Sequence, residues 1–216
     1  DTIRQVQAHI EQVDCYEINF CQEFHSQNAS IDPIALYAQL TALSPTPFAC
    51  FYKENNAHLI CASPERWLKK QGNQIISQPI KGTVKRELTD EVKDALLKNE
   101  LFQSSKDRSE NVMVVDLVRN DFSRVCKAGT VKVDELFGIY SFPQVHQMIS
   151  TISGQLLDGI GMSDLLNTGF PMGSMTGAPK KKVMELIQRF EPIERGLFSG
   201  AVGYINPNKD FDFNVV

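Results

Sequence analysis

Lys81 is the residue whose chemistry is most readily inferred from its neighbours. It lies in the sequence Pro-Ile-Lys-Gly-Thr at 79–83, between a short apolar segment and a Gly-Thr turn. That setting favours a side chain held in a pocket, where burial stabilises the neutral amine, and only a neutral amine acts as a nucleophile or a base. The alternative, from this segment alone, is a lysine in a surface turn.

Two carboxylates are candidates for acid–base or metal chemistry. Glu65 follows a predicted strand and precedes Arg66. It is either half of a solvated ion pair or a general acid or base facing a cleft. Glu110 lies near the start of a long predicted helix, one turn after Lys106, a spacing typical of a surface ion pair. The alternative is a Mg²⁺ ligand, because Mg²⁺ commonly takes one or two carboxylates together with substrate oxygens and waters.

The same helix carries a polar series on an otherwise apolar pattern. Asp116 and Asn120 are one turn apart, as are Asn120 and Arg124, whereas Val112, Val115, Val118, Phe122 and Val125 form an apolar stripe. We expect the polar series to be a buried network. Such networks more often stabilise a fold than perform chemistry.

A glycine-rich turn precedes another predicted helix. The sequence Gly-Ser-Met-Thr-Gly-Ala-Pro-Lys at 173–180 would present unpaired N–H groups and a helix dipole that favour an anion, and Thr176 adds a hydroxyl donor. The spacing differs from that of a P-loop. Glycine turns before helices are common, so this motif alone is a weak indication of a site.

Helices and strands are mixed along the chain without regular βαβ alternation, which predicts an α+β fold with mixed, largely antiparallel sheets packed with helices. Asp32 and Pro33 are typical of a helix start, Thr89 can cap a further helix, and Asn55-Asn56 is typical of a hairpin turn. Periodicity predicts helices near 3–13, 33–40, 89–96, 112–125, 163–164 and 179–187, and strands near 16–20, 48–52, 59–62, 75–76, 130–133 and 196–205.

Composition excludes several classes of protein. The 216 residues are 42% hydrophobic and 22% charged, with a net charge of -4, which is typical of one large or two small globular domains. No basic run suggests nucleic acid as a partner, no apolar stretch approaches the ~18 residues of a membrane span, and the polar start is unlike a signal peptide. The odd cysteine count without CxxC spacing indicates reduced thiols in a cytosolic protein.

The order of these motifs resembles the chorismate-utilising enzymes, which include anthranilate synthase component I, aminodeoxychorismate synthase component I, and the isochorismate and salicylate synthases. Lys81 is similar to the lysine typical of aminodeoxychorismate synthase component I, where anthranilate synthases usually have alanine. Gln147 and Phe198 stand where anthranilate synthases carry histidine and tyrosine. The matching segments are 12–19, 62–65, 79–83, 106–111, 115–121, 176–180 and 200–204.

The resemblance implies a fold like anthranilate synthase component I and a reaction on chorismate. Lys81 would attack ring carbon 2 and expel the 4-hydroxyl, which Glu65 would protonate. Ammonia would then add at carbon 4 and expel Lys81, giving 4-amino-4-deoxychorismate on the route to para-aminobenzoate and folate. Glu110 would bind Mg²⁺ together with the ring carboxylate of chorismate. The residues implied to hold substrate oxygens are Gly82, Thr83, Thr176 and Gly177.

The resemblance also implies a partner and further chain. No cysteine lies in a glutaminase-like context, so a separate glutamine amidotransferase subunit would supply the ammonia. A predicted strand stops at Val216. The family's second Mg²⁺ carboxylate, its Ile-Arg-Thr arginine and its Gly-Ala-Gly loop would follow that residue, and an amino-terminal half would precede residue 1. We therefore expect 1–216 to be part of a chorismate-binding catalytic domain, inactive alone.

Three alternatives remain open at this stage. The first is an anthranilate synthase component I that forms anthranilate and pyruvate despite its lysine. The second is a chorismate-binding module without catalytic activity. The third is a structural α+β domain whose motif matches are accidental. The product, or the absence of one, separates these possibilities.

Overall fold

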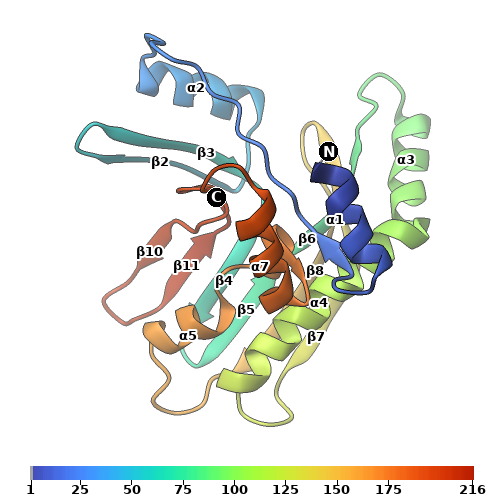
Figure 1. The fold of residues 1–216 in the computed structure, drawn as a ribbon, viewed down its shortest axis with the longest axis vertical. Coiled ribbons are helices and arrows are strands. Elements are labelled where there is room, and N and C mark those ends of the chain that lie inside the picture. The colour runs from blue at the N-terminus through green and yellow to red at the C-terminus, as the bar shows by residue number, and fades with distance from the viewer. Residues whose placement is uncertain (1) are drawn as a thin grey trace.

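The computed structural model describes residues 2–216 and is built around one large antiparallel sheet (Figure 1). Its path is β10-β11-β4-β5-β8-β6, and β7 pairs with the other edge of β8. These strands are β4 (Arg66–Gln71), β5 (Gln74–Gln78), β6 (Ile80–Lys85), β7 (Lys132–Ser141), β8 (Val145–Gln155), β10 (Gly203–Ile205) and β11 (Phe211–Asn214). The predicted α+β class with largely antiparallel sheets is confirmed.

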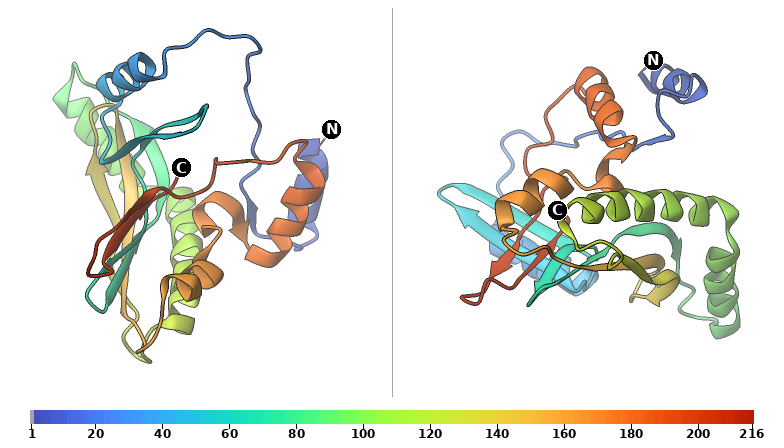
Figure 2. Two further views of the ribbon diagram at one scale, coloured as in Figure 1. Left: turned by 90° about the vertical axis from the view of Figure 1, so that its left-hand side faces the viewer. Right: turned by 90° about the horizontal axis from the view of Figure 1, so that it is seen from below.

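Helices cover one face of this sheet (Figure 2). The longest, α4 (Ser105–Val125), crosses the sheet and starts at Ser104, whose Oγ accepts a hydrogen bond from Asp107 N at 3.3 Å. The other helices are α1 (Thr2–Glu11), α2 (Pro33–Leu43), α3 (Glu91–Gln103), α5 (Met162–Gly169), α6 (Gly173–Thr176) and α7 (Lys180–Phe190). The hydrophobic core combines side chains of α4 with those of the strands and of α5. Its buried members include Trp67, Leu68, Ile75, Val115, Phe122, Val125, Ile152, Leu156, Leu165 and Phe211.

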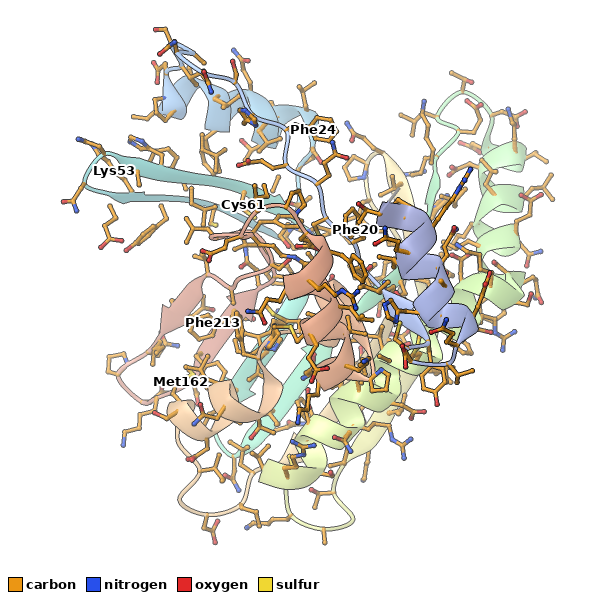
Figure 3. All side chains as sticks on the ribbon, viewed as in Figure 1. Phe20, Phe24, Lys53, Cys61, Met162 and Phe213 are labelled. Carbon is orange, nitrogen blue, oxygen red and sulfur yellow. The ribbon has the colours of Figure 1, made fainter. Side chains whose placement is uncertain are left out.

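Two small strand pairs lie outside the main sheet. The hairpin of β2 (Phe48–Glu54) and β3 (Ala57–Ser63) turns at Asn55-Asn56, as predicted, and Asn55 adopts a φ of 52°. Asp32 caps α2 as predicted, since its Oδ1 accepts from Ile34 N at 2.9 Å. The second pair joins β1 (Glu17–Ile18) to β9 (Gly177–Ala178). The segment that links β1 to α2 is extended, and its Phe24 is 92% exposed (Figure 3).

Several predicted boundaries were wrong. Asp90, not Thr89, caps α3. Pro179 is the N-cap of α7 instead of its first residue. The strand predicted at 16–20 is reduced to Glu17–Ile18, and the one predicted at 196–205 to Gly203–Ile205, because 197–199 form turns with Ser199 at a φ of 64°.

The polar series on α4 differs from the prediction. Asp116 pairs with Arg119 at 2.7 Å and Asn120 accepts from Arg124 at 3.0 Å, but these contacts lie on the exposed face, so the expectation of a buried network was wrong. Val112 is also 39% exposed, because the helix turns its Asn111, Val114 and Val115 toward the sheet.

One polar contact on the covered side of α4 is an ion pair to α7. Lys180 Nζ lies 2.6 Å from an oxygen of Asp121 and donates to Gly169 O at 3.4 Å. Burial raises the pKa of the Asp121 carboxyl, and the lysine partly offsets this. The pair joins α4 to the start of α7, which follows the glycine-rich turn.

Two further expectations concern the cysteines and membrane-spanning segments. The five cysteines are free thiols, as expected. Within residues 2–216, no helix combines the length and apolar character that a membrane-spanning segment requires.

Candidate active site

Lys81 lies in a β-bulge instead of the turn that the sequence suggested. Ile80 pairs with Ile149 and Thr83 with Gln147, so Lys81 and Gly82 together face one residue of β8. Bulges break the regular alternation of a strand and redirect side chains. Gly82 has a φ of 98°, and a Cβ there would lie 3.0 Å from Asp107 Cβ. Glycine therefore permits both the bulge and the close approach of α4.

The Lys81 amine is held by two side chains from β1 and the residue that follows it. Nζ forms an ion pair with Glu17 Oε1 and donates to Asn19 Oδ1 at 3.1 Å. Only 13% of the lysine side chain is exposed, which confirms that protein surrounds it. Lys81 is therefore half of an ion pair that protein largely surrounds, a partner that the segment 79–83 did not predict.

Glu17 and Asn19 were not recognised as site residues from the sequence. They are two positions apart in an extended segment, so their side chains point to the same side. That periodicity was visible in the sequence. Their approach to Lys81, 64 residues further along the chain from Glu17, was not.

The glycine-rich turn positions this part of the site. β1 pairs with β9, and a Cβ on Gly177, whose φ is 126°, would lie 2.1 Å from Glu17 O. Asn19 is fixed through its N to Thr176 O at 2.9 Å and its Nδ2 to Ser174 O at 3.0 Å. Arg195 Nη2 donates to Asn19 O at 2.7 Å. The turn thus holds Glu17 and Asn19 against Lys81.

Hydrogen-bond donors of the glycine-rich turn are bonded to carbonyl oxygens of the same segment. The Thr176 hydroxyl is buried and donates to Met172 O at 3.0 Å, and Gly177 N donates to Gly173 O. A direct contact of Thr176 or Gly177 with substrate oxygens therefore stays a prediction. Thr83 is exposed, and Gly82 is half-buried beside Lys81.

Glu65 contacts the same turn through Ser174. Its carboxyl accepts hydrogen bonds from the Ser174 side chain and the Ile80 backbone, and Ser174 also accepts from Asn19 through its carbonyl. Burial raises the pKa of Glu65 to about 7, against the lowering effects of these hydrogen bonds and of the Lys81 charge. A carboxyl that titrates near neutral pH is suited to general acid catalysis.

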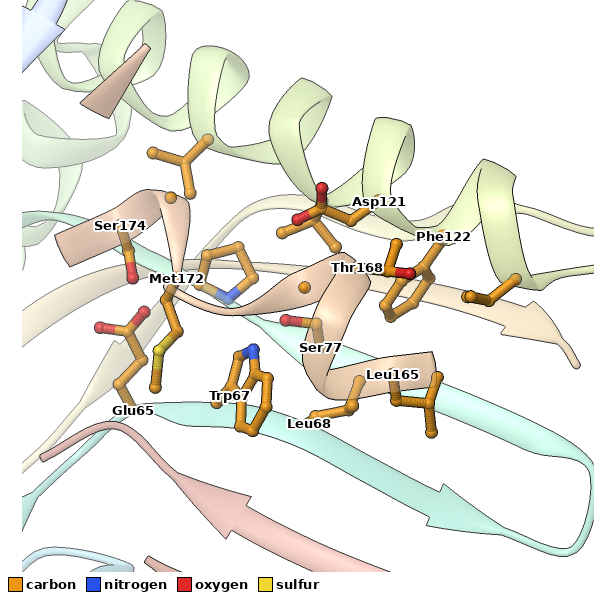
Figure 4. A pocket seen from close by; sticks show the side chains of 16 residues that line it. Glu65, Trp67, Leu68, Ser77, Asp121, Phe122, Leu165, Thr168, Met172 and Ser174 are labelled. Carbon is orange, nitrogen blue, oxygen red and sulfur yellow. The ribbon is translucent and has the colours of Figure 1, made fainter. Parts of the chain in front are cut away.

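The alternative in which Glu65 forms a solvated ion pair with Arg66 was wrong. Arg66 instead forms a two-pronged ion pair with Asp212 on β11, with nitrogen–oxygen distances of 2.9 and 3.0 Å. Glu65 is left to line a cavity of about 30 Å³ between the sheet and α4, together with Trp67 and Ser77 (Figure 4). That volume is about the size of one water molecule.

Glu110 lies on α4 one residue before Asn111, which donates weakly to Lys81 O at 3.5 Å. Its carboxylate pairs with Lys106 at 3.2 Å and its side chain is 33% exposed. Within residues 2–216, no three His, Cys, Asp or Glu side chains gather as a metal cluster. Glu110 therefore offers one accessible hard oxygen ligand, which suits Mg²⁺ only where substrate oxygens and waters complete its coordination.

Comparison with known proteins places this site in a family. A model described as chorismate binding enzyme matches residues 1–216, and the chain belongs to that family. It is 42% identical over 206 residues to aminodeoxychorismate synthase component 1 of Escherichia coli, covering 95% of this chain and 45% of that protein. It is 36% identical over 214 residues to the Bacillus subtilis protein of that name, covering 99% and 45%.

The fold resembles a solved structure of the same family. Anthranilate synthase component I from Streptococcus pneumoniae superposes with a TM-score of 0.90 at 26% identity, covering 100% of this chain and 47% of that one. The expected likeness to anthranilate synthase component I is confirmed. The chain spans a little under half the length of the curated bacterial relatives it matches.

Proposed function

We propose that the protein to which this chain belongs converts chorismate and ammonia into 4-amino-4-deoxychorismate. The observation that carries the proposal is the buried Glu65 carboxyl, whose pKa is raised to about 7 and whose charge interacts with that of Lys81. An amine and a proton donor at one site are what displacement of a hydroxyl through a covalent intermediate requires. The bacterial relatives that are 36% and 42% identical bear the name of this activity.

The chemistry divides between the two side chains. The Lys81 amine forms a bond to ring carbon 2 of chorismate, the ring double bonds shift, and the bond from carbon 4 to its hydroxyl breaks. Glu65 gives its proton to the leaving oxygen, which departs as water. Ammonia then bonds to carbon 4, the double bonds shift back, and the bond to Lys81 breaks. The covalent adduct divides one difficult displacement into two easier ones.

Substrate binding would involve the residues around this pair. Gly82, Thr83, Thr176 and Gly177 are proposed to hold substrate oxygens. When bound, Mg²⁺ would neutralise the ring carboxylate of chorismate and withdraw electrons from the diene, and Glu110 would hold the ion.

Product analysis tests the function directly. The full-length protein, supplied with chorismate, Mg²⁺ and ammonium, is expected to form an amine that keeps the enolpyruvyl group, detected by mass spectrometry. Formation of fluorescent anthranilate and pyruvate would instead establish the anthranilate synthase alternative, despite Lys81. Chorismate binding without turnover would establish the non-catalytic module.

Glu110→Gln tests the proposed metal ligand. Loss of a carboxylate ligand should raise the Mg²⁺ concentration for half-maximal rate by about tenfold or more. Calorimetric titration with Mn²⁺ in the presence of chorismate gives a readout independent of turnover. Asp116→Asn is the matched control, because Asp116 lies on the exposed face of the same helix. Unchanged affinity in Glu110→Gln would exclude Glu110 as a ligand.

The ammonia source is proposed to be a glutamine amidotransferase subunit in the cytoplasm. The name component 1 in the relatives implies a second component for those proteins. The five free cysteines of this chain fit a reducing compartment. Glutamine-dependent activity on adding an amidotransferase, and none with either protein alone, would support this arrangement.

A further inference from the structure

We propose that Glu17 is the base that takes the proton from the Lys81 ammonium, so that the free amine can attack the substrate. This inference rests on the proposed function and adds a catalytic residue to it. Lys81 must lose a proton before its nitrogen has a lone pair to donate. In the structure, the Lys81 nitrogen forms an ion pair with the Glu17 carboxylate.

The contacts of Lys81 narrow the choice of acceptor. Within residues 2–216, Nζ hydrogen-bonds to Glu17 Oε1 and Asn19 Oδ1. Asn19 offers an amide oxygen, which accepts hydrogen bonds but is too weak a base to take a proton from an amine. Glu65, whose charge state is linked to Lys81, must keep its own proton for the leaving hydroxyl. Glu17 is thus the base in direct contact with the amine.

The second oxygen of Glu17 supports this role. Oε2 is buried and accepts no hydrogen bond from any residue in 2–216, while the side chain as a whole is 17% exposed. A purely structural buried carboxylate usually has hydrogen bonds to both oxygens, because an unpaired buried acceptor costs about 1–3 kcal/mol. An oxygen without a donor leaves the negative charge of Glu17 less compensated and available for a proton.

Backbone contacts around Glu17 hold its carboxylate in a fixed position relative to Lys81. β1 pairs with β9, and Asn19, the residue that follows β1, accepts a hydrogen bond from Arg195 through its backbone oxygen at 2.7 Å. Arg195 is itself held by Glu191 at 2.6 Å. The carboxylate of Glu17 is therefore delivered to Lys81 by a rigid segment, as proton transfer over one hydrogen bond requires.

The proton balance closes over the cycle. Lys81 as ammonium and Glu17 as carboxylate become amine and carboxylic acid. The amine then attacks carbon 2 while Glu65 gives its proton to the leaving hydroxyl, which departs as water. When ammonia bonds to carbon 4 and the bond from carbon 2 to Lys81 breaks, Glu65 regains a proton from the new ammonium on carbon 4. Glu17 returns its proton to the released Lys81 amine. Two carboxyl groups thus act in the same site, one as base and one as acid, and their different surroundings set the roles. Charged groups that face this pair within residues 2–216 include Lys106, whose charge interacts with Glu17, Asp107 against Gly82, Glu65, and the Arg195–Glu191 pair at Asn19.

A structural role for Glu17 makes the opposite prediction. If Glu17 only stabilises the ammonium, then Glu17→Gln should increase the fraction of neutral amine and leave the reaction as fast or faster. If Glu17 is the base, the same change should slow the attack although it frees the amine. The direction of the rate change therefore separates the two roles.

The test is a rapid-quench experiment on the full-length protein with chorismate and no ammonia, following the mass of the Lys81 adduct. We expect the rate constant of adduct formation in Glu17→Gln to fall about 10²-fold at pH 7. The difference from wild type should be smaller at pH 9, because hydroxide in the solvent then deprotonates a larger fraction of the Lys81 ammonium without the help of Glu17. In Glu17→Gln, the rate at which an amine-reactive reagent acylates Lys81 should equal or exceed the wild-type rate. Glu23→Gln, on the next exposed segment, is the control for loss of one negative charge.

Two outcomes would overturn the inference. The first is an adduct rate in Glu17→Gln equal to or above that of wild type at pH 7. The second applies where Glu17→Gln does not fold: Glu17→Asp, which keeps the base but withdraws it, should lose about tenfold, and an unchanged rate would exclude the role. Failure of the proposed function is distinct, because the wild-type protein itself would then form no amine product that keeps the enolpyruvyl group.

Discussion

Replacing Lys81 by arginine is expected to reduce formation of 4-amino-4-deoxychorismate by roughly 10³-fold or more, without unfolding the protein. Arginine is always protonated and cannot form the covalent adduct, yet its guanidinium can keep the ion pair with Glu17. The measurement is the steady-state rate with ammonium as nitrogen donor, together with thermal unfolding of the full-length variant.

Arginine is a better first substitution than alanine here. Lys81→Ala would leave Glu17 buried without its cationic partner, and breaking a buried pair in this way costs about 3–5 kcal/mol in many proteins. Loss of activity in Lys81→Ala alone would therefore mix chemistry with instability. The double variant Lys81→Ala with Glu17→Gln removes both charges and should recover stability but not activity.

Lys85→Ala provides the matched control for the lysine substitution. Lys85 lies on the same strand, β6, with its side chain exposed and away from the bulge. Its replacement should leave the rate within about twofold of wild type. If Lys81→Arg kept more than about a tenth of the wild-type rate, a covalent role for this lysine would be untenable.

Replacing Glu65 by glutamine is expected to lower the rate of adduct formation by about 10²- to 10⁴-fold, the usual contribution of a general acid. The pKa of Glu65 is raised to about 7, so the protonated fraction in the wild type falls as the pH increases through that value. The wild-type rate should therefore decline between pH 6 and pH 8. The residual rate of Glu65→Gln should lack that decline, because glutamine does not titrate.

The same pKa shift predicts how stability varies with pH. The folded-state pKa of Glu65, about 7, lies above its reference value of 4.5, so the folded protein binds this proton more tightly than the unfolded chain does. The stabilisation is complete below pH 4.5 and is lost as the pH rises through 7. Between pH 5 and pH 8, the free energy of unfolding should fall by about 2–3 kcal/mol more in wild type than in Glu65→Gln.

Denaturant unfolding of both full-length proteins at pH 5 and pH 8 would measure this difference. Glu110→Gln is a suitable control for the stability comparison, because Glu110 pairs across one helical turn with an exposed lysine. Parallel pH dependences in wild type and Glu65→Gln would contradict the buried, proton-binding state of Glu65. A flat wild-type rate profile would separately contradict its role as the acid.

Local sequence patterns predicted the elements that depend on neighbouring residues. The cap at Asp32, the turn at Asn55-Asn56 and the long helix before Val125 all follow from capping, turn preference or helical period. The hairpin of β7 and β8 was largely missed for identifiable reasons. Residues of β8 are buried on both faces, so it lacks polar alternation. In β7, bulges and Phe137 at a φ of 61° interrupt the period of two.

Sequence alone supplied the chemical types proposed for the site: an amine at Lys81, a proton donor at Glu65 and an oxygen ligand at Glu110. It also predicted turns at Gly82 and in the glycine-rich segment that contains Gly177, and in the structure both glycines adopt a positive φ, which glycine does at little cost. The tertiary structure decided which charges meet. It brought Glu17 and Asn19 to Lys81 through the pairing of β1 with β9, and it enclosed the Glu65 carboxyl beside Ser174. Desolvation and long-range ion pairing depend on residues that are distant along the chain, so local sequence patterns do not predict them.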